Sequence, residues 1–394
     1  MIQQAVILAG GLGTRLGKLT AETPKPLLDV AGRPFICGLL DELRRHGVQR
    51  ILVLAGFCGD QIAAALADHA DVEVLIEPKP LGTGGALRFA VERLDDKFFF
   101  LNGDSLFDIN LLDLALLAKN DVEAALALRP VDDGSRYGEV VLAGSIITDF
   151  RERPFAPGPT LINGGVAVLS RSIIDRMEPD GAVSIERDIY PELASTGCMR
   201  GRAYDRPFLD IGVPEDFALA QTKIPAMLSR SAVIFDRDGV LNVDINYAHR
   251  PDQIQWIEGA FAAVKAVNDA GLFAYVATNQ AGVARGFYGE QEVIALHQWM
   301  NSQMMEHGAH IDAFEYSPYH PDGVVRKYSR PSECRKPNPG MLNRLLSRPG
   351  VVRDASFMIG DKASDMAAAA AASIDGVLFD GDNLMKTIAS RLAL

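Results

Sequence analysis

Val6-Ile-Leu-Ala-Gly-Gly-Leu-Gly-Thr-Arg15 joins a short apolar run to a glycine-rich turn. The apolar run predicts a buried strand, and the glycines let the backbone approach a ligand and aim N–H groups at anionic oxygens. The turn is not a dinucleotide-binding motif, because Leu16 occupies the third glycine position of that pattern. Arg15 and Lys25 flank the turn, and the prolines on either side of Lys25 restrict its backbone. A glycine turn with two cations predicts a site that holds a polyphosphate.

The alternation of strand and helix patterns continues along the whole chain. Bounded apolar runs predict buried strands, and apolar residues at helical spacing predict helices. In the first half, strands are expected at 6–9, 51–55 and 98–101, and helices at 35–46 and 60–67. The alternation of strands and helices starts again in the second half, with strands expected at 232–235, 271–277 and 356–359. We therefore predict an α/β protein with two doubly wound, Rossmann-like domains, at residues 1–226 and 227–394.

Composition and charge indicate a folded, soluble protein and argue against a nucleic-acid-binding one. The chain has 394 residues, too many for one compact core, and 48% of them are hydrophobic. Its net charge of −12 argues against nucleic acid, since Lys and Arg must neutralise phosphates there. Four scattered cysteines favour a reducing compartment, and no apolar segment is long enough for a signal peptide or a membrane span. We expect a cytoplasmic protein that binds no membrane, with homo-oligomerisation left open.

Two acidic residues in the first half are candidate metal ligands. Asp104 follows an expected strand in Asn102-Gly-Asp, where an acid of an α/β sheet faces the ligand crevice, although it could equally cap a helix. Asp210 lies in a later segment, Phe208-Leu-Asp-Ile-Gly. Carboxylates from two distant strands can share one Mg²⁺, which prefers hard oxygen ligands.

Together, the glycine turn and Pro24-Lys-Pro26 resemble the sugar-1-phosphate nucleotidyltransferase family, over residues 1 to about 221. The resemblance implies nucleotide contacts from Gly10, Gly11, Gly13, Thr14, Arg15, Lys25, Gly82, Thr83 and Gly84. It implies sugar contacts from Asn163, Gly164, Glu186 and Arg153. Arg153 falls where the family usually has a lysine on the sugar phosphate, so the charge is kept and the geometry changed. The motifs at 81–85, 129–138 and 162–166 look most like heptose-1-phosphate guanylyltransferases.

The reaction implied by this family needs no protein nucleophile. The sugar phosphate oxygen attacks the α-phosphorus of a nucleoside triphosphate, and pyrophosphate leaves. Arg15 and Lys25 would offset the charge of the phosphates, together with Mg²⁺ on Asp104 and Asp210. The choice of guanine rests on the resemblance alone.

A second phosphate motif, Phe235-Asp-Arg-Asp-Gly-Val240, follows the restart of the strand pattern. Side chains at i and i+2 of an extended segment point the same way, so Asp236 and Asp238 can face one centre. The motif resembles the haloacid-dehalogenase superfamily. That resemblance implies that Asp236 attacks phosphorus and that Asp238 protonates the leaving alcohol and then activates water.

The remaining motifs of that superfamily appear in order. Thr278 is expected to bind a phosphoryl oxygen, and Lys336 to hold the charged nucleophile. The candidate Mg²⁺ ligands are Asp236, Asp238 and Asp361, with Asp365 supporting them. Too few residues separate Asp238 from Thr278 for a large cap domain, so we expect a capless fold with an open site.

The wider sequence of this half, from residue 231 to about 370, closely resembles D-glycero-D-manno-heptose 1,7-bisphosphate phosphatases. The resemblance implies sugar or distal-phosphate contacts from Tyr247, His249, Asn279, Arg285 and Arg335. Most of these relatives carry a zinc loop with a Cys-x-His and a Cys-x-Cys pair. This chain has Ser317-Pro-Tyr319 and Ser332-Glu-Cys334 instead, and one thiolate cannot hold a structural zinc. We therefore predict no zinc, with the loop held by Tyr319, Tyr328 and nearby prolines.

The leading hypothesis is a bifunctional enzyme that acts twice on one heptose. The phosphatase half would produce heptose 1-phosphate, and the other half would convert it to a nucleotide-activated heptose, most simply GDP-heptose. One alternative keeps both reactions on another sugar or base, such as mannose or UTP. Histidinol phosphate is a further alternative substrate for the phosphatase half. A binding or regulatory protein with one inactive domain is the alternative from a different class.

Overall fold

The computed structural model describes residues 1–11, 13–134, 138–151 and 158–392. The chain divides into two compact units, Met1–Leu228 and Ser229–Leu394. The division falls at the end of α6 (Pro214–Leu228), whereas the boundary expected after residue 226 lies inside this helix. The helix continues past Pro225 because Ile224, one turn before its end, is buried in the core of the first unit.

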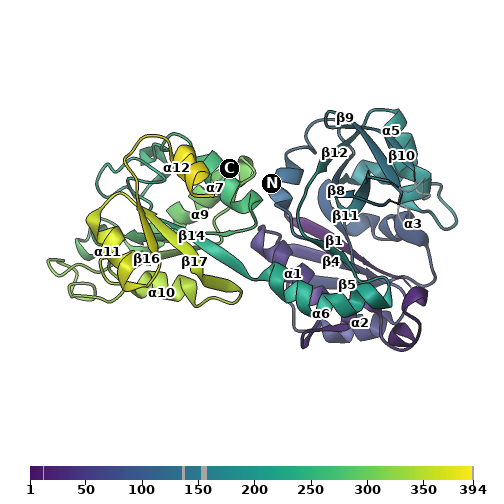
Figure 1. The fold of residues 1–394 in the computed structure, drawn as a ribbon, viewed down its shortest axis with the longest axis horizontal. Coiled ribbons are helices and arrows are strands. Elements are labelled where there is room, and N and C mark those ends of the chain that lie inside the picture. The colour runs from purple at the N-terminus through teal and green to yellow at the C-terminus, as the bar shows by residue number, and fades with distance from the viewer. Residues whose placement is uncertain (12, 135–137, 152–157, 393–394) are drawn as a thin grey trace. The chain divides into compact units, whose positions relative to one another are not determined.

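The first unit is built on a mixed nine-stranded sheet in the order β5-β4-β1-β6-β11-β8-β12-β10-β9 (Figure 1). Its strands are β1 (Gln4–Ala9), β4 (Arg50–Ala55), β5 (Val72–Ile76), β6 (Lys97–Asn102), β8 (Ala124–Val131), β9 (Glu139–Ala143), β10 (Ile146–Arg151), β11 (Thr160–Ser170) and β12 (Met199–Ala203). β1 pairs in parallel with β4 and β6, as the doubly wound pattern predicts. From β11 onward, antiparallel pairs enter the sheet. Two small ribbons, β2 (Asp29–Val30) with β3 (Arg33–Pro34) and β7 (Ser105–Phe107) with β13 (Phe208–Asp210), complete the strands.

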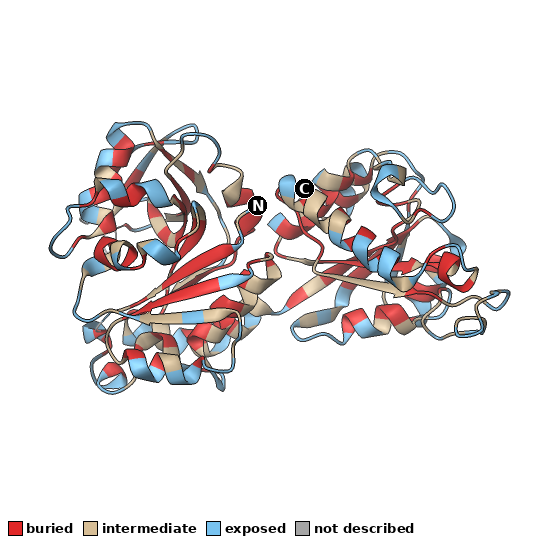
Figure 2. Ribbon diagram, turned by 180° about the vertical axis from the view of Figure 1, so that it is seen from behind, coloured by how far each residue is buried: buried red, intermediate tan, exposed pale blue. Residues whose placement is uncertain are grey.

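Helices cover both faces of this sheet and create two hydrophobic cores (Figures 1 and 2). One face carries α1 (Phe35–Arg45), α2 (Gly59–Ala65), α4 (Leu111–Ala115) and α6; the other carries α3 (Gly82–Phe89) and α5 (Tyr190–Ser195). The short helices are η1 (Thr14–Thr20), η2 (Lys25–Leu27), η3 (Val91–Arg93), η4 (Arg171–Arg176) and the π-helix η5 (Ile185–Ile189). Ile7 of β1 enters the first core and Val6 the second. A strand buried on both faces must be continuously apolar, which is why the opening run could be read as a strand.

The second unit is a parallel five-stranded sheet in the order β16-β15-β14-β17-β18. Its strands are β14 (Arg230–Phe235), β15 (Phe273–Asn279), β16 (Ala313–Ser317), β17 (Val351–Gly360) and β18 (Asp375–Leu378). One face packs against α7 (Ala260–Asp269), α9 (Glu290–Glu306) and α12 (Leu384–Leu392), and the other against α10 (Gly340–Leu346) and α11 (Ala363–Ala371). Phe235 and Ile234 enter opposite cores. The prediction of two α/β, Rossmann-like folds is confirmed.

The connection between β14 and β15 contains only η6 (Pro251–Gln253) and α7, and the next helix after β15 is the short α8 (Ala281–Ala284). No separate cap is inserted between residues 236 and 272, all of which the structure describes. In the described part of the chain, no helix combines the length and hydropathy needed to cross a bilayer.

Candidate active sites

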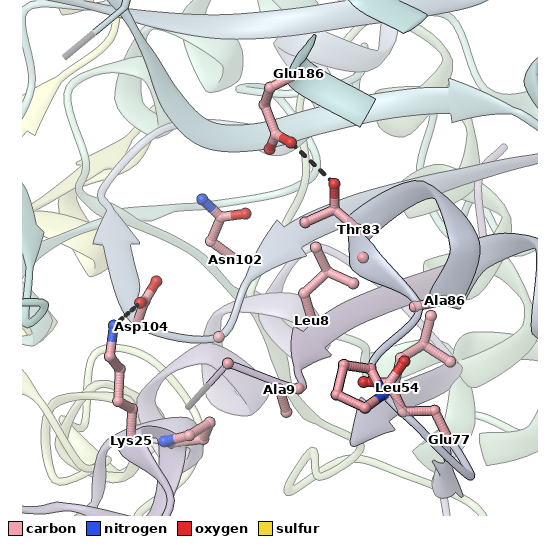
Figure 3. Close-up of a pocket in the computed structure, with 16 residues that line it drawn as sticks. Leu8, Ala9, Lys25, Leu54, Glu77, Thr83, Ala86, Asn102, Asp104 and Glu186 are labelled. Atoms are coloured by element: carbon pink, nitrogen blue, oxygen red, sulfur yellow. Dashed lines mark hydrogen bonds and ion pairs between the residues drawn. The ribbon is translucent and has the colours of Figure 1, made fainter. Parts of the chain in front are cut away.

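A cavity of about 420 Å³ lies at the carboxyl ends of β1 and β6 in the first unit (Figure 3). Ala9 and Asn102, the last residues of these strands, both line it. Gly10 and Gly11 of the turn after β1 form part of its wall, together with Lys25. The carboxyl ends of parallel strands are where α/β sheets bind ligands, so the glycine turn lies where the sequence predicted it.

A cation and two carboxylates meet on one side of this region. Lys25 Nζ lies 2.8 Å from Asp104 Oδ2, an ion pair drawn in Figure 3. The pairing of β7 with β13 brings Asp210 opposite Ser105, next to Asp104 in sequence. Asp104 O also accepts a 2.8 Å hydrogen bond from the N–H of Ile211. Two carboxylates that are distant in sequence are therefore neighbours, and they could hold a divalent metal ion.

Asp210 is an acid in an unfavourable environment. Burial raises its pKa to about 6, and the negative charge of Asp104 acts in the same direction. The N–H of Gly212 donates a 2.7 Å hydrogen bond to Asp210 Oδ1, which opposes this shift. A cation bound between Asp104 and Asp210 would remove the repulsion that raises this pKa.

The opposite wall of the cavity depends on a close approach between α3 and η5. Thr83 Oγ1 donates a 2.9 Å hydrogen bond to Glu186 Oε2 and accepts one of 2.8 Å from the N–H of Ile185. A Cβ atom on Gly82, whose φ is +77°, or on Gly84 would clash with Val183. Gly82 and Thr83 line the cavity. Gly84, expected at the nucleotide, is buried against Val183 instead.

The expected sugar motif forms an irregularity in β11. Its pairing with β8 shifts register between Asn163 and Ala167. A Cβ atom on Gly164 would overlap the ring of Phe107, and Asn163 Oδ1 accepts a 3.1 Å hydrogen bond from the N–H of Gly165. These glycines let β11 pack closely against the segment after β6. Neither Asn163 nor Gly164 is among the residues that line the cavity.

The remaining residues expected in the first site are Gly13, Thr14, Arg15 and Arg153. Gly13 has a φ of +65°, and its carbonyl accepts a 2.7 Å hydrogen bond from Thr20 Oγ1, so this glycine shapes the turn. Thr14 and Arg15 are exposed on η1 and do not line the cavity. Arg153 lies outside the described residues.

Sequence reasoning missed Glu77 in this site. Glu77 follows β5, lines the cavity, and accepts a 3.3 Å hydrogen bond from the N–H of Leu81 through Oε2. Its Oε1 occupies the space that a Cβ atom on Gly10 or Gly56 would need. Burial raises the pKa of the Glu77 carboxyl above its ordinary value. Its place directly after an expected parallel strand was the available signal.

The second unit holds a cluster of charges at the carboxyl end of β14. Lys336 Nζ lies 2.8 Å from Asp236 Oδ1 and 2.8 Å from Asp365 Oδ1, and it donates a 2.8 Å hydrogen bond to the carbonyl of Ala277. All three charged side chains are buried. Burial raises the pKa of Asp236 to about 6, although the charge of Lys336 opposes the shift.

Asp236, Asp361 and Asp365 form a possible metal site, because carboxylate oxygens of the three lie within 4.8 Å of one another. A Cβ atom on Gly239, whose φ is +95°, would overlap the Asp361 carboxylate. This close approach explains why glycine follows the second aspartate of the motif. Asp365 was expected to act only as a support for the metal ligands, yet its carboxylate belongs to the same cluster as those of Asp236 and Asp361.

Asp238 faces hydrogen-bond donors. Its carboxylate accepts hydrogen bonds from Arg237, from Asn242 Nδ2 at 2.9 Å and from Gln280 Nε2 at 3.0 Å. Gln280 Nε2 also donates a 2.9 Å hydrogen bond to Thr278 Oγ1. The acid–base candidate is thus tied to the residue expected to bind a phosphoryl oxygen. A metal contact from Asp238 stays a prediction.

The expected substrate residues of this unit include two neighbouring arginines. The charge of Arg285 and, more strongly, burial lower the pKa of Arg335, and Arg335 Nη1 donates to the carbonyl of Tyr319 at 3.2 Å. Tyr247 packs edge-on against Phe287, with ring centroids 4.9 Å apart.

Two other expected substrate residues make structural contacts. His249 stacks on Tyr288, with ring centroids 4.7 Å apart. Asn279 exchanges hydrogen bonds of 3.0 and 3.1 Å with the backbone of Lys336. Asn279 therefore fixes the segment that carries the lysine.

The segment between β16 and α10 is held by a carboxylate. Glu290 accepts hydrogen bonds from the hydroxyls of Tyr328 and Tyr316, the latter at 2.8 Å. Tyr319 and Tyr328 pack edge to face at 5.9 Å, as their proposed role in this loop requires. Glu290 was not foreseen, because it lies on α9, far from the loop in sequence.

Comparisons with known proteins agree with this geometry. A nucleotidyl transferase family model matches residues 4–226, and a HAD-hydrolase-like model matches residues 333–390. The D-glycero-beta-D-manno-heptose-1,7-bisphosphate 7-phosphatase of Rhodopseudomonas palustris is 41% identical over 155 residues, 39% of this chain and 86% of the relative. The D-glycero-alpha-D-manno-heptose 1-phosphate guanylyltransferase of Campylobacter jejuni is 33% identical over 221 residues, 54% of this chain and 96% of the relative.

The chain belongs to the nucleotidyl transferase family in its first unit and to the HAD-like phosphatases in its second.

Among solved structures, HddC from Yersinia pseudotuberculosis is similar to the nucleotidyl transferase unit. It is 33% identical, covers 56% of this chain and 99% of its own, and has a TM-score of 0.51. HddC has also been solved in complex with GMP-PN. The resemblances drawn from the motifs to these two families are confirmed, and both families generally use a divalent metal.

In the nucleotidyl transferase unit, Asp210→Asn should raise the melting temperature of the metal-free protein above about pH 6. Above that pH, Asp210 is charged in the folded and the unfolded chain, and only the folded chain bears the cost of burying the charge. Asparagine keeps the oxygen that accepts from Gly212. We expect a gain of a few degrees at pH 8 and none below about pH 4, where both states are neutral, measured by calorimetry with a chelator present.

The matched control for this experiment is Glu215→Gln, which removes an exposed charge from α6. It should leave the melting temperature nearly unchanged at both pH values. An Asp210→Asn protein that melts at or below the wild-type temperature at pH 8 would contradict the assignment of Asp210 as a buried, penalised acid.

Proposed function

We propose that this chain catalyses two consecutive steps on one seven-carbon sugar. The phosphatase unit removes the 7-phosphate of D-glycero-D-manno-heptose 1,7-bisphosphate, and the nucleotidyl transferase unit transfers GMP from GTP to the resulting heptose 1-phosphate. The observation that carries this proposal is the pair of relatives, one matching each unit, whose names share D-glycero-D-manno-heptose, as the beta anomer in one and the alpha anomer in the other. We propose that both units of this chain act on one anomer, so that the product of the first reaction is the substrate of the second, which gives the fusion a chemical reason.

In the phosphatase unit, the Asp236 carboxylate attacks the 7-phosphorus as the bond from phosphorus to the sugar oxygen breaks. Asp238 gives its proton to that oxygen. Water then attacks the aspartyl-phosphate and passes a proton to Asp238, and the Asp236 carboxylate leaves. Lys336, 2.8 Å from Asp236, holds the nucleophile in place and offsets charge on the phosphoryl group. Mg²⁺ held by Asp236 and Asp361, with Asp365 beside them, would offset further charge when bound.

In the nucleotidyl transferase unit, the sugar phosphate oxygen attacks the α-phosphorus of GTP, and pyrophosphate leaves. The N–H groups of the glycine turn and Lys25 bind the phosphates, and Thr83 and Glu186 form the opposite wall. Mg²⁺ on Asp104 and Asp210 would offset charge on the phosphates when bound. Alignment of the two phosphates supplies most of the rate, because no covalent intermediate is needed.

Arg285 and Arg335 are proposed to bind the 1-phosphate of the bisphosphate. Two arginines whose charges disfavour each other are stabilised by a shared anion, and a guanidinium can bind phosphate with two hydrogen bonds. The four cysteines of the chain are free, which supports a reducing, cytoplasmic setting.

Glu77 is proposed to select guanine. Its carboxylate offers acceptor oxygens to a cavity that Leu54 and Ala86 also line, and the 2-amino group of guanine is a donor that adenine and uracil lack. A buried acceptor left without its donor is costly, so this contact would discriminate between bases.

Asp236→Asn should abolish phosphate release from heptose bisphosphate and leave pyrophosphate release from GTP within about twofold, since each unit has its own core. Asp104→Asn should do the reverse. Phosphate and pyrophosphate assays on the same preparations check this. Loss of both activities in either variant, without unfolding, would rule out two independent sites.

Glu77→Gln should lower kcat/KM for GTP by roughly 10- to 100-fold, because glutamine presents only one acceptor oxygen in place of two. The preference for GTP over ITP, which lacks the 2-amino group, should shrink toward one. Glu73→Gln is the control, since Glu73 is exposed on β5 and pairs with Arg93. An unchanged GTP to ITP ratio in Glu77→Gln would refute base selection by this residue.

We propose that the loop of the phosphatase unit is held without zinc by Glu290. Metal analysis should give far less than one zinc per chain, and Tyr328→Phe should speed tryptic cleavage after Arg326 or Lys327. The lost hydrogen bond to a carboxylate is worth about 1.5–3 kcal/mol. Tyr319→Phe is the control, because the Tyr319 hydroxyl accepts a long, 3.4 Å hydrogen bond from the exposed Arg330. One zinc per chain would overturn the proposal.

A further inference from the structure

Arg237, between the two aspartates of the motif, is fully buried, with 0% of its surface exposed. Its Nη2 donates to both oxygens of Asp238, at 2.9 and 2.8 Å, and its Nε donates to Oδ1 at 3.1 Å. Nη2 also donates to the carbonyl of Ala248 at 2.8 Å. The residue that the motif leaves unspecified thus makes the densest set of contacts with the acid–base candidate.

The far side of the guanidinium is closed by a histidine. Arg237 Nη1 lies 3.4 Å from His297 Nε2, and burial and the charge of Arg237 hold the pKa of His297 well below its ordinary value. A neutral imidazole can accept from Nη1, and its ring stacks on Phe314 at 4.5 Å. Burying a guanidinium is costly unless its donors are used, so this arrangement fixes where Arg237 can lie.

Neutral amides complete the enclosure of Asp238. Asn242 Nδ2 donates to Oδ1 and Gln280 Nε2 to Oδ2, while Gln280 Oε1 accepts a 2.9 Å hydrogen bond from Tyr288. Both carboxylate oxygens therefore have a charged and a neutral donor. This set of donors allows one orientation of the carboxylate plane, and proton transfer depends on such orientation.

We propose that Arg237 is a positioning residue of the phosphatase reaction. It fixes the Asp238 carboxyl group while Oδ2 carries a proton in place of the Gln280 hydrogen bond, at the angle from which this proton passes to the leaving sugar oxygen and from which Oδ2 later receives a proton from the attacking water. This inference rests on the aspartyl-phosphate mechanism proposed for the second unit. The inference predicts that substitution of Arg237 slows phosphate release most from substrates whose leaving oxygen must be protonated.

The test compares two substrates in wild type, Arg237→Lys and Arg237→Met. The leaving oxygen of heptose bisphosphate needs a proton, whereas p-nitrophenolate leaves without one. Because kcat/KM reports formation of the aspartyl-phosphate, it should fall about 100-fold or more for the sugar phosphate in Arg237→Met and less than about fivefold for p-nitrophenyl phosphate. Arg237→Lys should recover part of the loss.

A second readout follows the water step. In Arg237→Lys, slow hydrolysis of the aspartyl-phosphate should produce a burst of about one p-nitrophenol per site. The lysine variant also keeps the inference testable if Arg237→Met does not fold. Pyrophosphate release by the first unit reports the integrity of each preparation. His297→Phe keeps the ring stack but removes the acceptor at Nη1 of Arg237, and it should give a smaller defect with the same selectivity for the sugar phosphate.

The outcomes separate the inference from the proposed function. Equal losses on both substrates in a folded Arg237→Lys protein, or no loss on either, would overturn the positioning role. Wild-type activity on p-nitrophenyl phosphate and hexose 6-phosphate but not on heptose bisphosphate would overturn the proposed substrate. The role of Arg237 would then be tested by comparing the variants on hexose 6-phosphate and p-nitrophenyl phosphate. A wild type inactive on every phosphate ester would overturn both.

Discussion

The burial of neighbouring carboxylates is the constraint that both sites must satisfy, because desolvation raises their pKa values and mutual repulsion adds to that shift. Asp236 and Asp365 are buried and share one lysine, Lys336, at 2.8 Å from each. In the first unit, Lys25 lies 2.8 Å from Asp104, which neighbours Asp210. The pKa values of Asp210 and Asp236 are each raised to about 6, so neither lysine removes the cost of burial completely. The remaining cost would be reduced by a bound cation, in agreement with the divalent metal that both families generally use.

Glycine is what allows the acidic groups to come so close. The motif glycine of the second unit, Gly239, lies where any side chain would overlap Asp361. In the first unit, Gly103 passes so close to β1 that its N–H donates to the carbonyl of Leu8 at 2.8 Å, which sets the start of the turn that carries Asp104. In both units a small residue beside an acid determines the spacing of the charges, and this spacing determines the chemistry.

The parts of the fold that follow from local patterns could be predicted. β1, β6 and β14 are continuous apolar runs because both faces of each sheet are covered, and the acids that follow β6 and β14 lie at the sites. The parts that depend on pairing between distant segments could not. The β7–β13 ribbon that joins Asp104 to Asp210 is only three residues long on each side, which is too short for a periodic signal.

The residues that the sequence analysis missed also depend on contacts between distant segments of the chain. Glu77 and Glu290 stand in no motif, and each matters only because a distant loop folds back on it. Gly84 belongs to a motif that was assigned to the nucleotide, but its place against Val183 is set by the π-helical turn η5, which no local pattern predicts. The motifs thus identified the two families, whereas the residues that contact the motifs from distant segments could be found only in the structure.

The charge of the chain shows how such sites work on anionic substrates. With a net charge of −12, the protein as a whole repels phosphates. Screening limits that repulsion to about 10 Å at an ionic strength near 0.1 M, so a few cations at the site outweigh a distant excess of acids. Lys25, Lys336, Arg285 and Arg335 are the cations proposed for this role, and each is partly or wholly buried. Because a buried cation has few waters to compete with, its attraction to a phosphate exceeds that of an exposed one. The placement of these four residues, rather than the balance of charge, would therefore let an acidic protein bind the phosphate groups of the proposed substrates.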